Sequence, residues 1–131
     1  MSFGQRSFDR QKPEIDFPAH DAPTELRIED LIEGTGEEAK PGNTVSTHYV
    51  GVAFSTGEEF DASWNRGAPL DFKVGVGQVI QGWDQGLLGM KVGGRRRLEI
   101  PSELAYGAGG AGSAIGPDES LIFVVDLLGV R

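Results

Sequence analysis

The chain of 131 residues has no cysteine and only two histidines, His20 and His48. The lack of cysteine excludes a disulfide scaffold, a thiol nucleophile and a thiolate metal site, and it fits a reducing compartment. Neither histidine has a second histidine or a cysteine at the spacing that metal ligands require. We therefore expect a protein that works without a metal or any other cofactor.

Long apolar runs and an excess of positive charge are also missing. No segment approaches the roughly 18 consecutive apolar residues of a membrane span, and the polar, charged N-terminus does not resemble a signal peptide. The chain has 12 basic and 20 acidic residues, a net charge of −8, so its surface repels phosphate backbones. These features predict a cytoplasmic protein that binds neither membranes nor nucleic acid.

The length suits one domain, with a different kind of sequence at its N-terminal end. Residues 1–23 are mostly polar, and Pro13, Pro18 and Pro23 would interrupt any helix there. We predict a flexible or extended tail over 1–23 and a folded domain over 24–131. The isolated apolar residues of the tail leave open the alternative that it docks on the domain.

The 20 glycines lie between short apolar runs, a pattern typical of strands joined by tight turns. The predicted strands are 26–32, 44–54, 59–61, 70–74, 95–100 and 121–128. One helix is predicted over 78–88, where Ile80, Trp83 and Leu87 share a face and Asp84 is the odd polar member. Many strands and one helix indicate an α+β domain in which a sheet wraps over the helix.

Three motifs with other possible functions are weak. The G-x-G-x-x-G match at 107–112 is followed by residues that cannot begin a good helix, so a mobile loop is favoured over a dinucleotide site. The arginines at 95–97 alternate along a strand, and a solvated sheet face is favoured over a phosphate site. No nucleophile-elbow motif supports a Ser-His-Asp triad.

Aromatic residues are sparse but sit in predicted ordered elements: Tyr49, Phe60, Phe72, Trp83, Tyr106 and Phe123. For any one of them a plain hydrophobic core is the simpler interpretation. However, Gly82 and Gly86 flank Trp83 and would leave space open beside the indole. Tyr106 precedes a glycine-rich loop, where its hydroxyl can lie at the rim of a pocket.

Five segments, taken in order, resemble the successive signatures of the FKBP family of peptidyl-prolyl cis-trans isomerases. They are HYVG at 48–51, FDAS at 60–63, VIQGWDQG at 79–86, LAYG at 104–107 and LIFVVDLL at 121–128. The resemblance covers about residues 26 to 131 without a large insertion. It implies an α+β fold in which a curled antiparallel sheet of five or six strands wraps around one short α-helix.

The resemblance also implies an apolar pocket with Trp83 as its floor. The residues it places in a catalytic role are Tyr49, Phe60, Asp61, Trp83, Tyr106 and Phe123, and those it adds for ligand binding are Arg66, Leu70, Val79, Ile80 and Ile115. The backbone N–H of Ile80 and the hydroxyl of Tyr106 would donate to ligand carbonyls, and Arg66 would pair with Asp61. Leu70 stands where many members have an aromatic residue, and Ala111, Ala114 and Gly116 alter the loop after Tyr106.

The implied activity is rotation about X-Pro bonds, a rotamase function in protein folding and chaperone work. The implied partners are proline-containing polypeptides, with tacrolimus and rapamycin as small-molecule ligands, and the protein is expected to be a monomer. An apolar pocket destabilises the planar, dipolar amide more than the twisted one, so no nucleophile, metal or general acid is needed. The alternative is a non-catalytic peptide-binding or holdase module that uses the same pocket.

Overall fold

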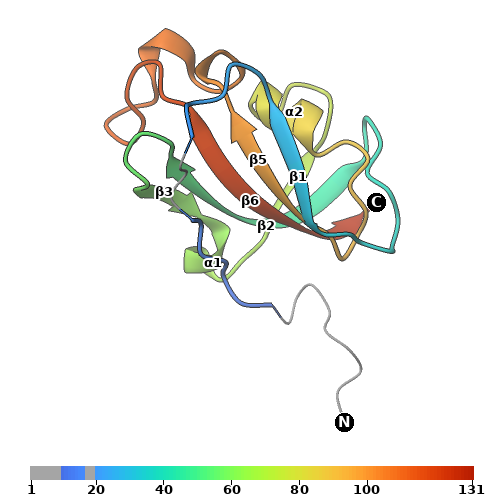
Figure 1. Ribbon diagram of the computed structural model, residues 1–131. Coiled ribbons are helices and arrows are strands. Elements are labelled where there is room, and N and C mark those ends of the chain that lie inside the picture. The colour runs from blue at the N-terminus through green and yellow to red at the C-terminus, as the bar shows by residue number, and fades with distance from the viewer. Residues whose placement is uncertain (1–9, 17–19) are drawn as a thin grey trace.

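The computed structural model describes residues 10–16 and 20–131, and Figure 1 shows its curled sheet with α2 packed on one face. The strands are β1 Arg27–Ile32, β2 Thr44–Ala53, β3 Glu59–Ala62, β4 Leu70–Lys73, β5 Arg95–Ile100 and β6 Leu121–Val130. The helices are α1 Ser63–Arg66 and α2 Gln81–Gly86, with two short 3₁₀ turns, η2 Ser102–Leu104 and η3 Gly107–Gly109. The predicted α+β architecture is confirmed, although the single turn α1 was not predicted.

All strand pairs are antiparallel, and the sheet order is β1-β5-β6-β2-β3. β4 and β3 share one edge of β2, since β4 pairs with Thr44 to Thr47 and β3 pairs with Val50 to Val52. His48 and Tyr49 lie between these two ladders. The gap places Tyr49 at the point where β3 and β4 separate.

β6 is central, and its apolar run follows from burial on both faces. Phe123, Val125 and Leu127 belong to the main core between the sheet and α2. The alternate residues Ile122 and Val124 form two smaller clusters with apolar side chains of β2, and Ile15 packs against both clusters. Residues near the N-terminus therefore cover part of the outer face of the sheet.

Helix α2 is shorter than the predicted 78–88, because it begins after Ile80 and ends at Gly86. Its glycines bring it close to β5 and do not open space beside the indole as the sequence suggested. A Cβ at Gly82 would lie 2.5 Å from Ile100 Cγ2, and one at Gly86 would lie 2.9 Å from Leu98 Cδ2. A side chain at either position would force the facing residue of β5, or the helix itself, to move.

The segment of residues 10–16, which we call the N-terminal strap, makes polar contacts on the outer face. Arg10 donates to the Asp126 carboxylate at 3.0 Å and to the Gly93 carbonyl at 2.6 Å. Lys12 pairs with Glu59 at 2.7 Å and donates to Asn65 of α1, beside which the strap runs in Figure 1. For these residues the contacts favour the docked alternative over a loose tail. The division of the chain at residue 23 stays a prediction, and residues 1–9 and 17–19 lie outside the described part.

The arginine run is not the solvated sheet face that we expected. Arg95 and Arg97 do point away from Arg96, but each is engaged by a carboxylate: Arg95 by Asp126 at 2.8 Å and Arg97 by Glu99 at 3.0 Å. Arg96 is buried and pairs with Asp30 at 2.7 Å, while it donates to the Gly86 carbonyl at the end of α2. All three arginines are therefore paired with carboxylates of the sheet, and Arg96 also joins the sheet to α2.

Candidate functional site

A cavity of about 420 Å³ opens to solvent where β3 and β4 separate on the edge of β2. It is lined by Tyr49, Phe60, Asp61, Leu70, Gly77, Gln78, Val79, Ile80, Trp83, Tyr106 and Phe123. These residues come from four strands, from α2 and from two loops. The structure thus brings together nine of the eleven residues that the sequence assigned to ligand binding.

Trp83 is almost fully buried among aromatic rings at the base of the cavity. Its ring centroid lies 5.0 Å from that of Tyr49 and 5.1 Å from that of Phe123, both edge to face. Phe72 packs on the indole from the core at 5.5 Å. Edge-to-face packing of this kind fixes the rings relative to one another, so the cavity base is rigid and apolar.

Gly51 on β2 allows two of these rings to meet. A Cβ at this position would lie 2.6 Å from Phe123 Cε1 and 2.7 Å from Phe60 Cζ. Phe60 and Phe123 are themselves edge to face at 5.5 Å. The contact between Phe60 and Phe123 in the cavity wall therefore requires glycine at position 51.

A polar triangle closes one edge of the cavity. The Tyr49 hydroxyl donates to Asp61 Oδ2 at 2.5 Å, and Arg66 donates to Asp61 Oδ1 at 2.7 Å and to the Tyr49 hydroxyl oxygen at 2.8 Å. Burial favours the neutral acid, but the hydrogen bonds from Tyr49 and Arg66 outweigh it and hold the pKa of Asp61 below its ordinary value. Asp61 is thus a carboxylate whose two oxygens are both engaged at neutral pH.

The two tyrosines of the cavity keep their protons at neutral pH. Burial, followed by the hydrogen bond to Asp61, raises the pKa of Tyr49, and burial with the nearby charge of Asp61 raises the pKa of Tyr106. The proton of the Tyr49 hydroxyl is already donated to Asp61. Tyr106 is 42% exposed at the rim, so its hydroxyl can donate to a bound molecule.

Two predicted residues do not line the cavity, and two unpredicted ones do. Arg66 acts on the cavity only through Asp61 and Tyr49, and Ile115 is buried in the core beneath the loop. Gly77 and Gln78 line the wall but were missed. Their neighbour Val79 was predicted as a binding residue and could have pointed to them. However, the helix was predicted to begin at residue 78, so the loop that carries them was not recognised.

The second histidine does not form a catalytic triad. His48 Nδ1 lies 2.8 Å from Ser63 Oγ, and burial, partly opposed by the charge of Asp126, lowers the pKa of His48. However, Ser63 is fully buried, and its Oγ accepts the Tyr49 N–H at 2.7 Å. Ser63 thus satisfies the Tyr49 N–H on the edge of β2 where neither β3 nor β4 pairs, and no substrate can reach its hydroxyl.

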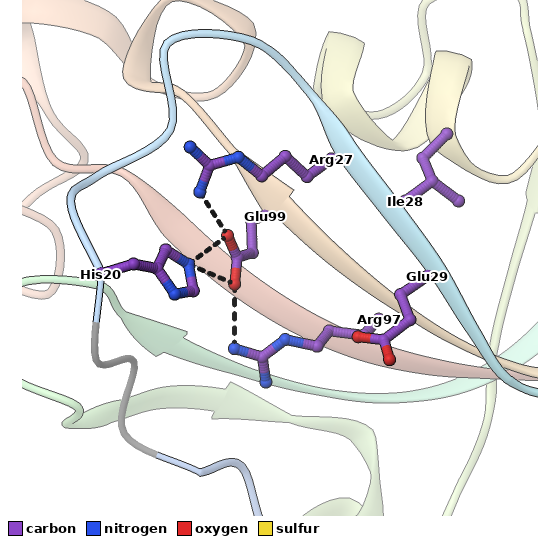
Figure 2. A pocket seen from close by; sticks show the side chains of 6 residues that line it. All are labelled: His20, Arg27, Ile28, Glu29, Arg97 and Glu99. Atoms are coloured by element: carbon purple, nitrogen blue, oxygen red, sulfur yellow. Dashed lines mark hydrogen bonds and ion pairs between the residues drawn. The ribbon is translucent and has the colours of Figure 1, made fainter.

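A second cavity, of about 450 Å³, is lined by His20, Arg27, Ile28, Glu29, Arg97 and Glu99. Figure 2 shows His20, Arg27 and Arg97 converging on the carboxylate of Glu99. Burial opposes the charge of Glu99, but its hydrogen bonds with these three side chains hold its pKa below the ordinary value. None of its six lining residues is Phe, Tyr or Trp, so it does not fit the aromatic site expected from the sequence.

Other kinds of site find no support in residues 10–16 and 20–131. No group of three or more His, Asp or Glu side chains there could hold a metal ion. No helix among the same residues is long and apolar enough to cross a membrane. The segment 107–112 forms a 3₁₀ turn followed by a bridge between Ala111 and Ile115, with no α-helix to receive a phosphate.

A family model described as FKBP-type peptidyl-prolyl cis-trans isomerase matches residues 35–128. The chain belongs to this family. An FK506-binding protein of Streptomyces anulatus is 65% identical over 121 residues, which are 92% of this chain and 98% of that protein. The Saccharomyces cerevisiae protein named peptidyl-prolyl cis-trans isomerase FPR2 is 49% identical over 94 residues, 72% of this chain and 70% of that protein.

Solved structures of FKBP proteins have the same fold. The crystal structure of AtFKBP13 matches with a TM-score of 0.76 and 42% identity, over 84% of this chain and 96% of that one. FkpA from Escherichia coli matches with a TM-score of 0.74 and 42% identity, over 81% of this chain and 48% of that one. The resemblance to the FKBP family, the fold and the enzyme class of peptidyl-prolyl cis-trans isomerase predicted from the sequence are confirmed.

Proposed function

We propose that this FKBP-type enzyme accelerates rotation about X-Pro bonds in folding or flexible polypeptides by binding the twisted amide in the cavity above Trp83. The observation that carries the proposal is the open, rigid cavity of about 420 Å³ with aromatic rings at its base. Nine predicted binding residues line it, and they come from four strands, from α2 and from two loops. A proline-containing segment is the proposed substrate.

The chemistry needs little beyond such a cavity. The barrier of about 18–20 kcal/mol comes from the loss of amide resonance in the twisted state. Water stabilises the strongly dipolar planar amide, whereas aromatic walls do not, so transfer into the cavity costs the planar form more than the twisted form. Each 1.4 kcal/mol or so of this difference is worth about tenfold in rate.

The roles of individual groups follow from where they lie. Trp83 seats the proline ring, and the Ile80 N–H and the Tyr106 hydroxyl orient the peptide at the wall and the rim. Asp61 has a positioning role, because both of its oxygens are already occupied by Tyr49 and Arg66. It keeps the Tyr49 ring in place and is not free to bind the rotating carbonyl directly.

The Streptomyces anulatus relative is named an FK506-binding protein, and we extend that ligand class to this chain. Tacrolimus and rapamycin would occupy the cavity in place of the peptide. Leu70 lines the wall where many family members carry an aromatic ring, and it offers a macrolide less flat contact area. The affinity for tacrolimus is therefore expected to rise in Leu70→Phe, as followed by Trp fluorescence.

A protease-coupled assay on a prolyl peptide tests the proposal. Phe60→Ala and Trp83→Ala should each lower kcat/KM at least about tenfold, since each removes an apolar wall of the cavity. Because Trp83 is buried and its loss can unfold the domain, Phe60→Ala is the decisive variant. Ile28→Ala is the matched control, since Ile28 is exposed on β1, outside the Trp83 cavity, and its loss should leave kcat/KM unchanged.

The holdase alternative has a distinct result. A wild-type rate equal to that in buffer, together with tacrolimus binding that Phe60→Ala abolishes, would leave only a binding role for the cavity. A rate that is enhanced in the wild type and equally enhanced in Phe60→Ala would place catalysis elsewhere on the molecule.

A further inference from the structure

Asp84 is the polar residue that interrupts the apolar face of α2, and its carboxylate explains the exception. Its Oδ1 accepts the N–H of Gly75 and its Oδ2 accepts the N–H of Gly77, both at 2.8 Å. Both amides belong to the loop 74–79 that joins β4 to α2. One side chain on the helix thus holds two points of the loop that precedes it.

The middle of this loop, residues 75–77, has little else to fix its shape. Gly75 and Gly77 have φ angles of +81° and +83°, a conformation that glycine adopts freely and that other residues rarely adopt. Val74 is fully buried in the core and Val79 packs against it, but Val76 is 53% exposed, so packing holds the ends of the loop and leaves residues 75–77 without apolar contacts to fix them. Beyond the loop's backbone contacts with residues 42 and 43, the Gln78 side chain accepts the N–H of Lys73 at 2.8 Å. Hydrogen bonds, two of them to a carboxylate, therefore set the loop conformation.

This loop forms part of the wall of the cavity. Gly77, Gln78 and Val79 line it, and Ile80 follows directly at the start of α2. Asp84 itself is not a lining residue, but it follows Trp83 in the same helix. Its carboxylate therefore links the wall to the helix that carries the floor.

We propose that Asp84 is a positioning residue for the prolyl isomerase reaction, which rests on the proposed function of the cavity. Its carboxylate holds the loop 74–79 in the shape that receives the peptide, so binding does not have to order the loop. If the substrate has to order the loop, part of the binding free energy is used for that ordering and binding weakens. The apolar floor formed by Trp83 is unchanged, so the rotation of the bound amide is affected less. The loss of Asp84 is therefore expected to raise KM more than it lowers kcat.

The test compares Asp84→Ala, Asp84→Asn and wild type in the prolyl-peptide assay and in amide hydrogen exchange by NMR. Asp84→Ala should raise KM about tenfold with kcat changed less than about threefold, the size expected for lost hydrogen bonds to a charged group. Asp84→Asn keeps one acceptor and should recover part of the KM. The Gly75 and Gly77 amides should exchange faster in Asp84→Ala while the amides of β6 keep their protection.

Glu119→Ala supplies the matched control. Glu119 also holds a loop, since its carboxylate accepts the Ser55 N–H at 3.1 Å and the Ser55 hydroxyl at 2.5 Å, but neither residue lines the Trp83 cavity. Its loss should leave KM unchanged. An Asp84→Ala enzyme with wild-type KM, or with unchanged exchange at Gly75 and Gly77, overturns the role of Asp84 while the proposed function stands. A wild-type enzyme that is no faster than buffer overturns both.

Discussion

The polar groups at the cavity edge are Asp61 and the two side chains, Tyr49 and Arg66, that donate hydrogen bonds to it. Its carboxylate receives hydrogen bonds from Tyr49 and Arg66, and these hold its pKa below the ordinary value against the opposing effect of burial. An acid whose folded pKa is lowered adds stability above its unfolded pKa of about 3.9 and loses that contribution as pH falls through the folded value. The triangle is therefore intact at neutral pH and opens only in acid.

Tyr49→Phe tests this account of Asp61. The variant removes one donor to the carboxylate, so the pKa of Asp61 should rise, while Arg66 keeps it from rising as far as in the double variant with Arg66→Ala. The measurement is the pH titration of the Asp61 carboxyl carbon by NMR in the three proteins. Equal midpoints in wild type and Tyr49→Phe would show that the hydroxyl does not stabilise the carboxylate.

Gly51→Ala tests the packing of the cavity wall. The added methyl would lie within 2.7 Å of both Phe60 and Phe123, and these rings cannot both stay in place. We expect unfolding to become easier by about 1–3 kcal/mol and kcat/KM to fall about tenfold. The readouts are urea denaturation and the prolyl-peptide assay.

Gly129→Ala is the control for this substitution. Gly129 is also a strand glycine, but a Cβ there would come no closer than 4.0 Å to Ser46 Cβ. It should change neither quantity appreciably. If Gly51→Ala behaves like Gly129→Ala, the two rings adapt freely and the cavity is less rigid than its packing indicates.

At the level of elements, the strands could be predicted because their signal is local. β-Branched and aromatic residues are frequent along β2 and apolar residues run along β6, and each predicted strand matches an observed one within two residues at either end. The start of α2 could not be predicted in the same way. Gln78, Val79 and Ile80 fit a helical pattern, but they follow loop amides at Gly75 and Gly77 that donate to Asp84, a contact that spacing does not reveal.

Contacts between side chains far apart in the chain could not be predicted from the sequence either. Nothing local to the arginine run shows that Arg95 meets Asp126, since the pair depends on the register of β5 against β6. The same holds for the N-terminal strap, whose composition resembles that of a loose tail. Its apolar residue Ile15 is isolated in the sequence but packs on clusters formed by residues of β2, β3 and β6.

Arg10→Ala tests whether the N-terminal strap is part of the fold. Arg10 shares the fully buried Asp126 with Arg95, so its loss leaves a buried carboxylate with one partner fewer. We expect the free energy of unfolding to fall by about 1–3 kcal/mol in urea denaturation. Lys12→Ala, which breaks a half-exposed pair with Glu59, should cost at most about 1 kcal/mol. Equal and negligible effects would return the segment to the status of a loose tail.

The whole molecule uses its two sheet faces for different purposes. The inner face, with α2, builds the aromatic cavity, while the outer face carries ion pairs and two small apolar clusters on which Ile15 packs. Figure 2 shows one such ion-pair cluster, in which His20 reaches the buried Glu99. The monomeric state, the cytoplasmic location, the work without a cofactor and the lack of nucleic-acid or membrane binding stay predictions.

The central claim is that a prolyl amide turns over in the cavity above the Trp83 indole. The most direct test is a two-dimensional exchange NMR spectrum of a prolyl peptide with a small amount of enzyme. The account predicts cis–trans exchange far faster than the uncatalysed tens to hundreds of seconds, together with cross-peaks from the proline ring to the Trp83 indole. Uncatalysed exchange, or cross-peaks to Ile28 in the other cavity and none to Trp83, would contradict it.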